Sequence, residues 1–522
     1  MSKCKLAVCL ACLGCAVLAA QVQTSAPNLP KLIELDDNSA TTASAIKTLL
    51  LALNPMNTNA RRLAPSLTRV GPTLAQKKVP PENSDDFDED DDEEFDEDAL
   101  REALEFEGGE IGDAVGPVLH VGIIGYGLVG KELVNQIITQ KDSLEKEMGV
   151  VIQIEAVARS KTMTFLTDDD VLKDGGWPEV EEKVDLQKLG MTLQRATTVT
   201  GGRAIIVDNT ASDAPVELYE QWLMDGIDVV TPNKRAGSGP FERYERIMAA
   251  SKDGGSRFMY EATVGAGLPI IAPLQTLRRA GDKVKSVGGI FSGTLSYIFN
   301  TWKPGMRFSE VVADAKAKGF TEPDPRDDLG GTDVQRKVVI LARELGLELE
   351  LDDVPVESLV PDELQNWEPP AGKNLGDAFV EELGKFDDDM TTLIQDAEKA
   401  DEVLRYVGTV DMATGTASVK LGRYPKDHPF AATQFADNIV TYETKWYSPR
   451  PLVVQGPGAG AAVTAAGIFG NIVESVMTLK EDFAMNFNDD DDIGDLPEDI
   501  EAGVEELRRI MREEGLGKEN SS

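Results

Sequence analysis

The chain is poor in the residue types that most often carry out acid–base and nucleophilic chemistry. It has two histidines and four cysteines in 522 residues, and Cys4, Cys9, Cys12 and Cys15 all lie within the first fifteen. The rest of the chain therefore has no disulfide, no thiolate metal site and no cysteine nucleophile. We expect proton transfer to use another group, and a lysine beside an aspartate is the best candidate.

Positive charge is also scarce. The chain carries 52 Lys and Arg against 91 Asp and Glu, a formal net charge of -39, which argues against a nucleic-acid partner. Many of the acids lie in two low-complexity runs, Ser84–Asp98 and Asn488–Asp495. Such runs cannot bury enough apolar surface to fold, so we interpret them as a disordered linker and tail. A partner-binding acidic arm is the alternative.

The N-terminal region has the composition of a two-part targeting leader. Lys3 and Lys5 precede an apolar run from Leu6 to Ala20, the pattern of a secretory signal. The span that follows is rich in Ser, Thr and Ala, has basic residues and few acids, and is typical of a plastid transit peptide. Together they resemble the leader that algae with secondary plastids use, so we expect a plastid protein. An ordinary secreted protein is the alternative. We expect no later apolar run to be long enough to span a bilayer.

A glycine-rich loop follows the leader and linker. The apolar run Val118–Ile124 predicts a buried strand, and the next residues, Gly125 to Gly130, form a GxGxxG motif that opens a helix. Gly125 permits the tight turn, Gly127 lets a pyrophosphate approach the backbone, and Gly130 allows close helix–strand packing. The context predicts a dinucleotide site; a bare structural turn is the alternative.

The residues after the second predicted strand bear on which dinucleotide binds. Val151–Ala158 ends at Arg159 and Lys161, where an NAD site usually has an acid for the ribose 2′-hydroxyl. Two cations favour the 2′-phosphate of NADP. A solvated basic turn is the alternative, and NAD remains possible.

Three later segments have two interpretations each. Lys234 follows the predicted strand Ile227–Thr231, where it is either a ligand-facing residue or a surface lysine. The segment Glu261–Pro269 suits either a domain hinge or a monovalent cation held by oxygen ligands. A second glycine loop, Gly456–Gly460, opens a helix that we expect to return to the first domain and close over the cofactor. A packing turn is its alternative reading.

The segment Gly319–Lys337 places several carboxylates on a proline-containing loop before a helix. Asp333 and Lys337 share a face of that helix at i and i+4, so both can project into a site enclosed by the loop. A solvated surface ion pair is the alternative. The strands predicted near Leu404–Val410 and Thr416–Leu421 indicate an antiparallel α+β second domain. Between the helix and these strands, Leu351–Ala400 is predicted to form a helical insertion at the periphery of that domain.

The order and spacing of these motifs resemble the homoserine dehydrogenase family over roughly Val118 to Met477. The segments that carry the resemblance are Gly125–Gly130, Thr231–Lys234, Glu261–Pro269, Gly289–Tyr297, Thr321–Lys337 and Gln455–Gly470. No region resembles the aspartate kinase fused to some members or an ACT regulatory domain. The resemblance implies NAD(P)H-linked reduction of L-aspartate 4-semialdehyde to L-homoserine, and the reverse, in threonine, methionine and isoleucine biosynthesis.

The resemblance also implies a role for each matching residue. Lys337 corresponds to the acid/base lysine, with Asp333 beside it and Lys234 reaching cofactor and substrate. Substrate contacts are implied for Glu322 (which receives the ammonium), Asp328, Asp333 and Thr294. Cofactor contacts are expected of Gly125, Tyr126, Gly127, Leu128, Val129, Gly130, Arg159, Lys161, Thr210, Lys234 and Gly460. A sodium site is implied for Glu261 with the carbonyls of Val264, Ala266 and Leu268.

One position departs from the family pattern, because Phe320 stands where the family commonly has tyrosine. We expect altered substrate affinity rather than lost chemistry. Two rival functions fit the sequence less well. A phosphorylating semialdehyde dehydrogenase needs a cysteine that the body lacks. A non-catalytic NADP-binding regulator would not need Glu322, Asp328, Asp333 and Lys337 together.

The predicted fold class is α/β: a Rossmann-type domain plus an α+β catalytic and dimerisation domain, with the C-terminal segment returning to the first domain. The expected divisions are a leader (1–80), an acidic linker (81–115), the NAD(P)-binding domain (116–260), the substrate domain (261–448), the return (449–480) and an acidic tail (481–522). We expect a homodimer with NADP and sodium, a small-molecule substrate and no membrane association of the mature protein.

Overall fold

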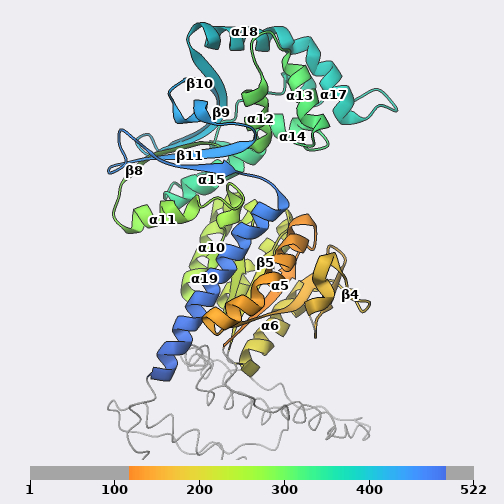
Figure 1. Cartoon of the computed structure of the whole chain (residues 1–522), viewed down its shortest axis with the longest axis vertical. Helices are drawn as coiled ribbons and strands as arrows, with labels where there is room; N and C mark the ends of the chain where they lie inside the picture. The colour runs from red at the N-terminus through yellow and green to blue at the C-terminus, as the bar shows by residue number, and fades with distance from the viewer. Residues whose placement is uncertain (1–116, 168, 201, 489–522) are drawn as a thin grey trace, which may run out of the picture. The chain divides into compact units, whose positions relative to one another are not determined.

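The computed structural model describes residues 117–488, except 168 and 201 (Figure 1). The predicted leader, the acidic linker and most of the predicted acidic tail lie outside these residues. The described part of the chain carries two sheets.

The first sheet has the strand order β4-β3-β2-β1-β5-β6-β7. Strands β2, β1, β5, β6 and β7 pair in parallel, whereas β3 and β4 are antiparallel additions at one edge. The bounds are β1 (Val118–Ile124), β2 (Val151–Ala158), β3 (Thr162–Phe165), β4 (Glu182–Lys183), β5 (Arg203–Asp208), β6 (Ile227–Val230) and β7 (Phe258–Met259). Because β1 lies between β2 and β5, the strand order reverses there, which is the topological switch point of a Rossmann-type sheet.

The helices of this domain connect the parallel strands, as βαβ crossovers require. They are α5 (Leu128–Met148), η2 (Asp169–Gly175), α6 (Leu186–Thr200), α7 (Asp213–Val216), α8 (Tyr219–Met224), α9 (Lys234–Ser238) and α10 (Phe241–Gly254). Helix α5 buries Leu133, Val134, Ile137 and Ile138 against strand β1. These are the apolar positions expected at helical spacing after a first strand.

The second sheet has the order β10-β9-β8-β11-β12, with every neighbouring pair antiparallel. Its strands are β8 (Val284–Ile290), β9 (Glu402–Asp411), β10 (Thr416–Pro425), β11 (Asp437–Thr444) and β12 (Leu452–Pro457). The helical elements are η3 (Glu261–Thr263), α11 (Ile271–Arg279), α12 (Gly293–Thr301), α13 (Phe308–Ala317), α14 (Pro325–Leu329), α15 (Thr332–Glu344), η4 (Leu351–Asp353), α16 (Asp362–Gln365), α17 (Leu375–Leu383), η5 (Gly384–Phe386), α18 (Asp387–Lys399) and η6 (Pro429–Ala432).

The prediction that Leu351–Ala400 is peripheral is wrong for its helices α17 and α18. Phe379 is fully buried, and Leu383 and Ile394 are at most 8 % exposed. All three belong to the same core cluster as the β9 residues Leu404 and Tyr406. The acidic composition of the segment hid this apolar face, which recurs at helical spacing between the charged residues.

The last helix, α19 (Ala461–Asn488), returns to the first domain. Its buried residues Ala465, Ile468, Ile472 and Val476 share a core with Leu119 of β1 and with α5, and Figure 1 draws α19 (blue) alongside α5 (orange). The stretch Ala461–Lys480 is long and apolar enough to cross a membrane by length and composition alone, which the sequence reading missed. One face of this stretch packs with β1 and α5, and 33 % of its apolar window is buried.

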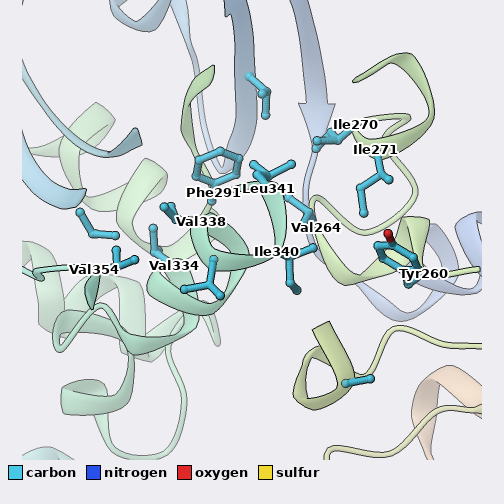
Figure 2. Packing of buried hydrophobic residues seen from close by; sticks show 14 of the residues in the cluster. Tyr260, Val264, Ile270, Ile271, Phe291, Val334, Val338, Ile340, Leu341 and Val354 are labelled. Atoms are coloured by element: carbon cyan, nitrogen blue, oxygen red, sulfur yellow. The ribbon is translucent and has the colours of Figure 1, made fainter. Parts of the chain in front are cut away.

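Helix α15 is buried along most of its length. Val334, Val338 and Leu341 are buried on it, and they pack with Phe291 in the cluster drawn in Figure 2. The helix therefore has a fixed position, and any polar group on it is held by this apolar packing.

Candidate functional site

The glycine loop between β1 and α5 has the geometry of a pyrophosphate cradle. Gly125 adopts a φ of 89°, which favours glycine. A Cβ on Gly130 would lie 2.3 Å from the carbonyl oxygen of Gly125, so only glycine fits that close approach. Helix α5 starts after Gly127 with no side-chain cap and no acidic residue in its first turn. Its first N–H groups therefore remain available to an anion.

The end of β5 forms the opposite wall of this cradle. The Thr210 methyl group would lie 3.0 Å from a Cβ on Gly125, so Thr210 abuts the loop as its expected role requires. Asn209 precedes it, and neither amide atom of its side chain has a partner among the described residues although both are buried. A buried unsatisfied amide is costly, so Asn209 fits a polar ligand. We did not single out this side chain from the sequence.

The remaining expected nucleotide contacts surround the same loop. Tyr126 is 5 % exposed and Leu128 is 84 % exposed, while Val129 is half-buried. Gly460, with φ 119°, precedes the first turn of α19. At the end of β2 the Arg159 guanidinium lies 3.6 Å from the centre of the Trp177 ring, and Lys161 is exposed.

A buried lysine lies on helix α15 of the second domain. Lys337 is 8 % exposed on α15. Its Nζ lies 2.7 Å from Asp333 Oδ2, one turn earlier, and donates to the Phe291 carbonyl at 2.6 Å. Burial lowers the pKa of Lys337, the Asp333 charge opposes this, and the Lys234 charge adds to the lowering. The result is an amine whose pKa is below its ordinary value.

Lys234 brings the first domain into contact with this pair. Its Nζ lies 3.2 Å from Asp333 Oδ1, so one carboxylate joins both lysines. Lys234 opens α9 directly after Asn233, whose side chain caps the helix and donates to Asp208 at the end of β5. Partial burial alone would raise the pKa of Asp333, but the charges of Lys337 and Lys234 outweigh it and hold that pKa well below its usual range.

A second cluster lies in the acidic loop. The backbone N–H of Glu322 donates to Asp328 Oδ2 at 2.8 Å, and Thr294 Oγ1 donates to the Phe320 carbonyl at 2.6 Å. Burial raises the pKa of Asp328. The Phe320 ring stacks on Tyr297 with 4.4 Å between centroids and remains 40 % exposed.

The two clusters are linked only indirectly in the described residues. The Glu322 side chain is exposed and has no hydrogen bond or ion pair to Lys337, Asp333 or Lys234. The link is the turn before α12: the Phe291 carbonyl accepts from Lys337, and the helix begins two residues later and carries Thr294. The role of this carbonyl was not visible in the sequence, because any residue supplies one.

Glu261 has structural partners. Its carboxylate accepts the N–H groups of Ile270, Ile271 and Ala272 at 2.5, 2.6 and 2.7 Å, and so caps the start of α11. Burial raises its pKa, although these three bonds oppose the shift. The segment after it runs close to α19, since a Cβ on Gly467 would lie 2.8 Å from the Ala266 carbonyl oxygen. Within the described range no cluster of three His, Cys, Asp or Glu residues forms a metal site.

The first domain is a Rossmann-type sheet with an open helix N-terminus, and a residue of that domain contacts a buried lysine–aspartate pair. Together these features define an NAD(P)-dependent oxidoreductase. Family models agree. Residues 125–261 match "Homoserine dehydrogenase, NAD binding domain" and residues 269–473 match "Homoserine dehydrogenase".

Curated relatives show the same family. The homoserine dehydrogenase of Schizosaccharomyces pombe is 40 % identical over 372 residues, which cover 69 % of this chain and 96 % of that protein. The homoserine dehydrogenase of Saccharomyces cerevisiae is 38 % identical, and the match covers 69 % of this chain and 99 % of that protein. The chain therefore belongs to the homoserine dehydrogenase family, and the resemblance and the predicted fold class are confirmed.

Two further comparisons bear on length and fold. The chloroplastic bifunctional aspartokinase/homoserine dehydrogenase 1 of Arabidopsis thaliana is 46 % identical over 365 residues. The matched region covers 69 % of this chain but only 39 % of that protein, so the chain spans well under half of its length. A crystal structure of a Candida auris protein of unknown function matches with a TM-score of 0.63 and 38 % sequence identity. The match covers 69 % of this chain and 99 % of that protein.

Proposed function

We propose that the chain catalyses the reversible NAD(P)H-dependent reduction of L-aspartate 4-semialdehyde to L-homoserine, in the branch that leads to threonine, methionine and isoleucine. The observation that carries this proposal is the buried Lys337, held by Asp333 and the Phe291 carbonyl and reached by Lys234 from the nucleotide-binding domain. The names of the yeast relatives support the same reaction.

Lys337 is the proposed acid and base. When bound, the nicotinamide would supply the hydride, and negative charge would develop on the aldehyde oxygen. A protonated Lys337 stabilises that charge and donates the proton, and in oxidation the neutral amine accepts it. The lowered pKa serves both directions, because an amine that gives up its proton more readily than an ordinary lysine can act as a base as well as an acid.

The other residues have supporting roles in this proposal. Asp333 orients the two lysines and the substrate rather than activating Lys337, since its charge raises the lysine pKa. Glu322, whose carboxylate is exposed and unpaired in the described residues, receives the substrate ammonium, and Asp328 and Thr294 line the site wall. Phe320 contacts this wall without the usual hydroxyl, so it alters affinity.

We assign the cofactor as NADP on the strength of Arg159 and Lys161 at the end of β2. A guanidinium and an ammonium at this edge suit a 2′-phosphate and offer no acceptor for the ribose 2′-hydroxyl of NAD. The glycine cradle, the uncapped start of α5 and the unpartnered Asn209 amide fit the dinucleotide itself.

We also propose a sodium ion at Glu261, whose carboxylate caps α11. The donor set of one carboxylate and three carbonyls still suits a hard cation. We expect sodium chloride to raise both the thermal midpoint and kcat above their values in tetramethylammonium chloride at equal ionic strength. Equal values in the two salts would rule out the sodium site.

We propose a homodimer formed through the second domain. Strand β12 lies at the edge of the antiparallel sheet, and Val453 on it is 40 % exposed. An exposed edge of this kind is a ready pairing surface for a second copy. Light scattering should give twice the mass of one chain; a single-chain mass would contradict it.

The plastid location is proposed from the composition of residues 1–80, and the name of the Arabidopsis thaliana relative includes the same compartment. Fluorescent protein fused behind these residues should enter the plastid of an alga with secondary plastids; secretion of the fusion would favour the alternative.

The proposed function is tested by following nicotinamide absorbance with L-aspartate 4-semialdehyde as substrate. We expect the purified full chain to oxidise NADPH with this substrate, and NADH less efficiently. Turnover of unrelated aldehydes but not of L-aspartate 4-semialdehyde would exclude the assignment.

A further inference from the structure

Three cations gather at the carboxyl edge of β1 and β2 without carboxylate partners. Arg159 directly follows β2, Lys161 lies two residues later, and Lys131 lies in the first turn of α5. None of the three has an ion pair within the described residues. By contrast, Arg235 pairs with Asp213, and Arg326 pairs with Asp324. In a chain of net charge -39, a cationic cluster that attracts no carboxylate is suited to an anionic ligand.

Arg159 is held by aromatic rings rather than by acids. Its guanidinium carbon lies 3.6 Å from the centre of the Trp177 ring and 5.8 Å from that of Tyr126. Lys131 Nζ lies 5.6 Å from the Tyr126 ring. A stacked guanidinium uses its face, whereas its N–H groups point outward in its plane. Stacking on Trp177 therefore orients Arg159 while leaving its donors for a phosphate.

Trp177 is in turn fixed by the glycine loop. The Tyr126 hydroxyl lies 3.1 Å from the carbonyl oxygens of Leu172 and Gly176 and shares its one proton between them. The rings of Tyr126 and Trp177 are 5.5 Å apart, and the Trp177 indole N–H donates to Glu181 at 2.9 Å. The segment that carries Trp177 is thus tied directly to the loop that cradles the pyrophosphate.

We propose that Trp177 is a specificity-determining positioning residue, which stacks against Arg159 and holds its guanidinium where the 2′-phosphate of NADP binds, with Tyr126 anchoring the Trp177 segment. This inference rests on the proposed NADP cofactor and deepens it. The discrimination between NADP and NAD comes from an aromatic platform as well as from the two cations after β2. Nothing in the spacing of the glycine motif indicates this platform, since Trp177 lies 47 positions after Gly130.

The test measures binding without catalysis. Adenosine 2′,5′-bisphosphate and adenosine 5′-monophosphate are titrated calorimetrically into the full chain and into Trp177→Leu, Trp177→Phe and Tyr126→Phe. We expect Trp177→Leu to weaken the bisphosphate roughly tenfold and the monophosphate less than about twofold, since one cation–π contact and one charge-assisted bond are affected. Trp177→Phe keeps a ring face and should recover most of the affinity. Tyr126→Phe should give a smaller loss in the same direction.

Trp446→Leu is the matched control, because Trp446 is 56 % exposed and lies beyond β11 in the second domain; both affinities should remain at wild-type values. In kinetics, Trp177→Leu should raise KM for NADPH, with kcat and the NADH constants nearly unchanged. Equal weakening of the two adenosine ligands by Trp177→Leu would overturn the proposal, as would unchanged binding of both. If the wild type does not distinguish the two ligands, the 2′-phosphate site is wrong, while the dehydrogenase function can still be tested with NADH.

Discussion

Replacing Lys337 with methionine is expected to lower kcat by about a thousandfold or more, because the reaction loses its proton donor and the charge that stabilises the developing alkoxide. The affinity for NADPH should stay close to wild type, since the hydrogen-bond and ion-pair partners of Lys337 among the described residues, Phe291 and Asp333, lie outside the glycine loop. The measurement is steady-state kcat for both directions, together with NADPH binding by fluorescence titration.

Two observations separate this effect from misfolding. Methionine has a length similar to lysine, and Asp333 keeps its ion pair with Lys234, so the thermal midpoint should fall little. Lys399→Met is the control: Lys399 is 74 % exposed on α18 and pairs with Asp396 at i and i+3, and its loss should leave kcat unchanged. A Lys337→Met variant with kcat within threefold of wild type would remove Lys337 from the mechanism.

Asp333→Asn is expected to lower kcat for reduction by about a hundredfold, because one carboxylate positions both lysines and its loss leaves two ammonium groups facing each other. The same change should alter the pH profile. The Asp333 charge raises the pKa of Lys337, so its removal lowers that pKa further.

The sign of the pH effect follows from the role of the lysine. Reduction needs protonated Lys337, so its rate falls as pH rises through the lysine pKa, and in Asp333→Asn this fall should begin at lower pH. Oxidation needs the neutral amine, so its rising limb should shift toward lower pH as well. Asp396→Asn, which breaks only the exposed pairs with Lys399 and Arg423, should leave both limbs of the pH profile in place. A shift toward higher pH in Asp333→Asn would contradict the assigned electrostatics.

Much of the first domain was predictable because its strands are short apolar runs bounded by glycine and polar residues. β1 and β2 begin and end at the predicted residues. The antiparallel additions β3 and β4 were not predicted, because four- and two-residue strands at a sheet edge carry little periodicity. In the second domain, α17 and α18 read as peripheral because their acids outnumber the apolar residues that pack inside.

The site was predictable only where its geometry is local. Asp333 and Lys337 meet because they are one helical turn apart, a relation visible in sequence. The contact of Lys234 with Asp333 depends on how α9 and α15 pack, and its expectation came from family resemblance alone. The Phe291 carbonyl, the Asn209 amide and the Trp177 ring reach their positions through tertiary structure, and none belongs to a motif that marks it beforehand.

The most direct test of the account is the oxidation of L-homoserine with NADP by the full chain, run beside its Lys337→Met variant. The account predicts rapid formation of NADPH by the wild type and almost none by the variant, although both bind the cofactor equally. No NADPH from the wild type, or equal rates from the two proteins, would contradict it.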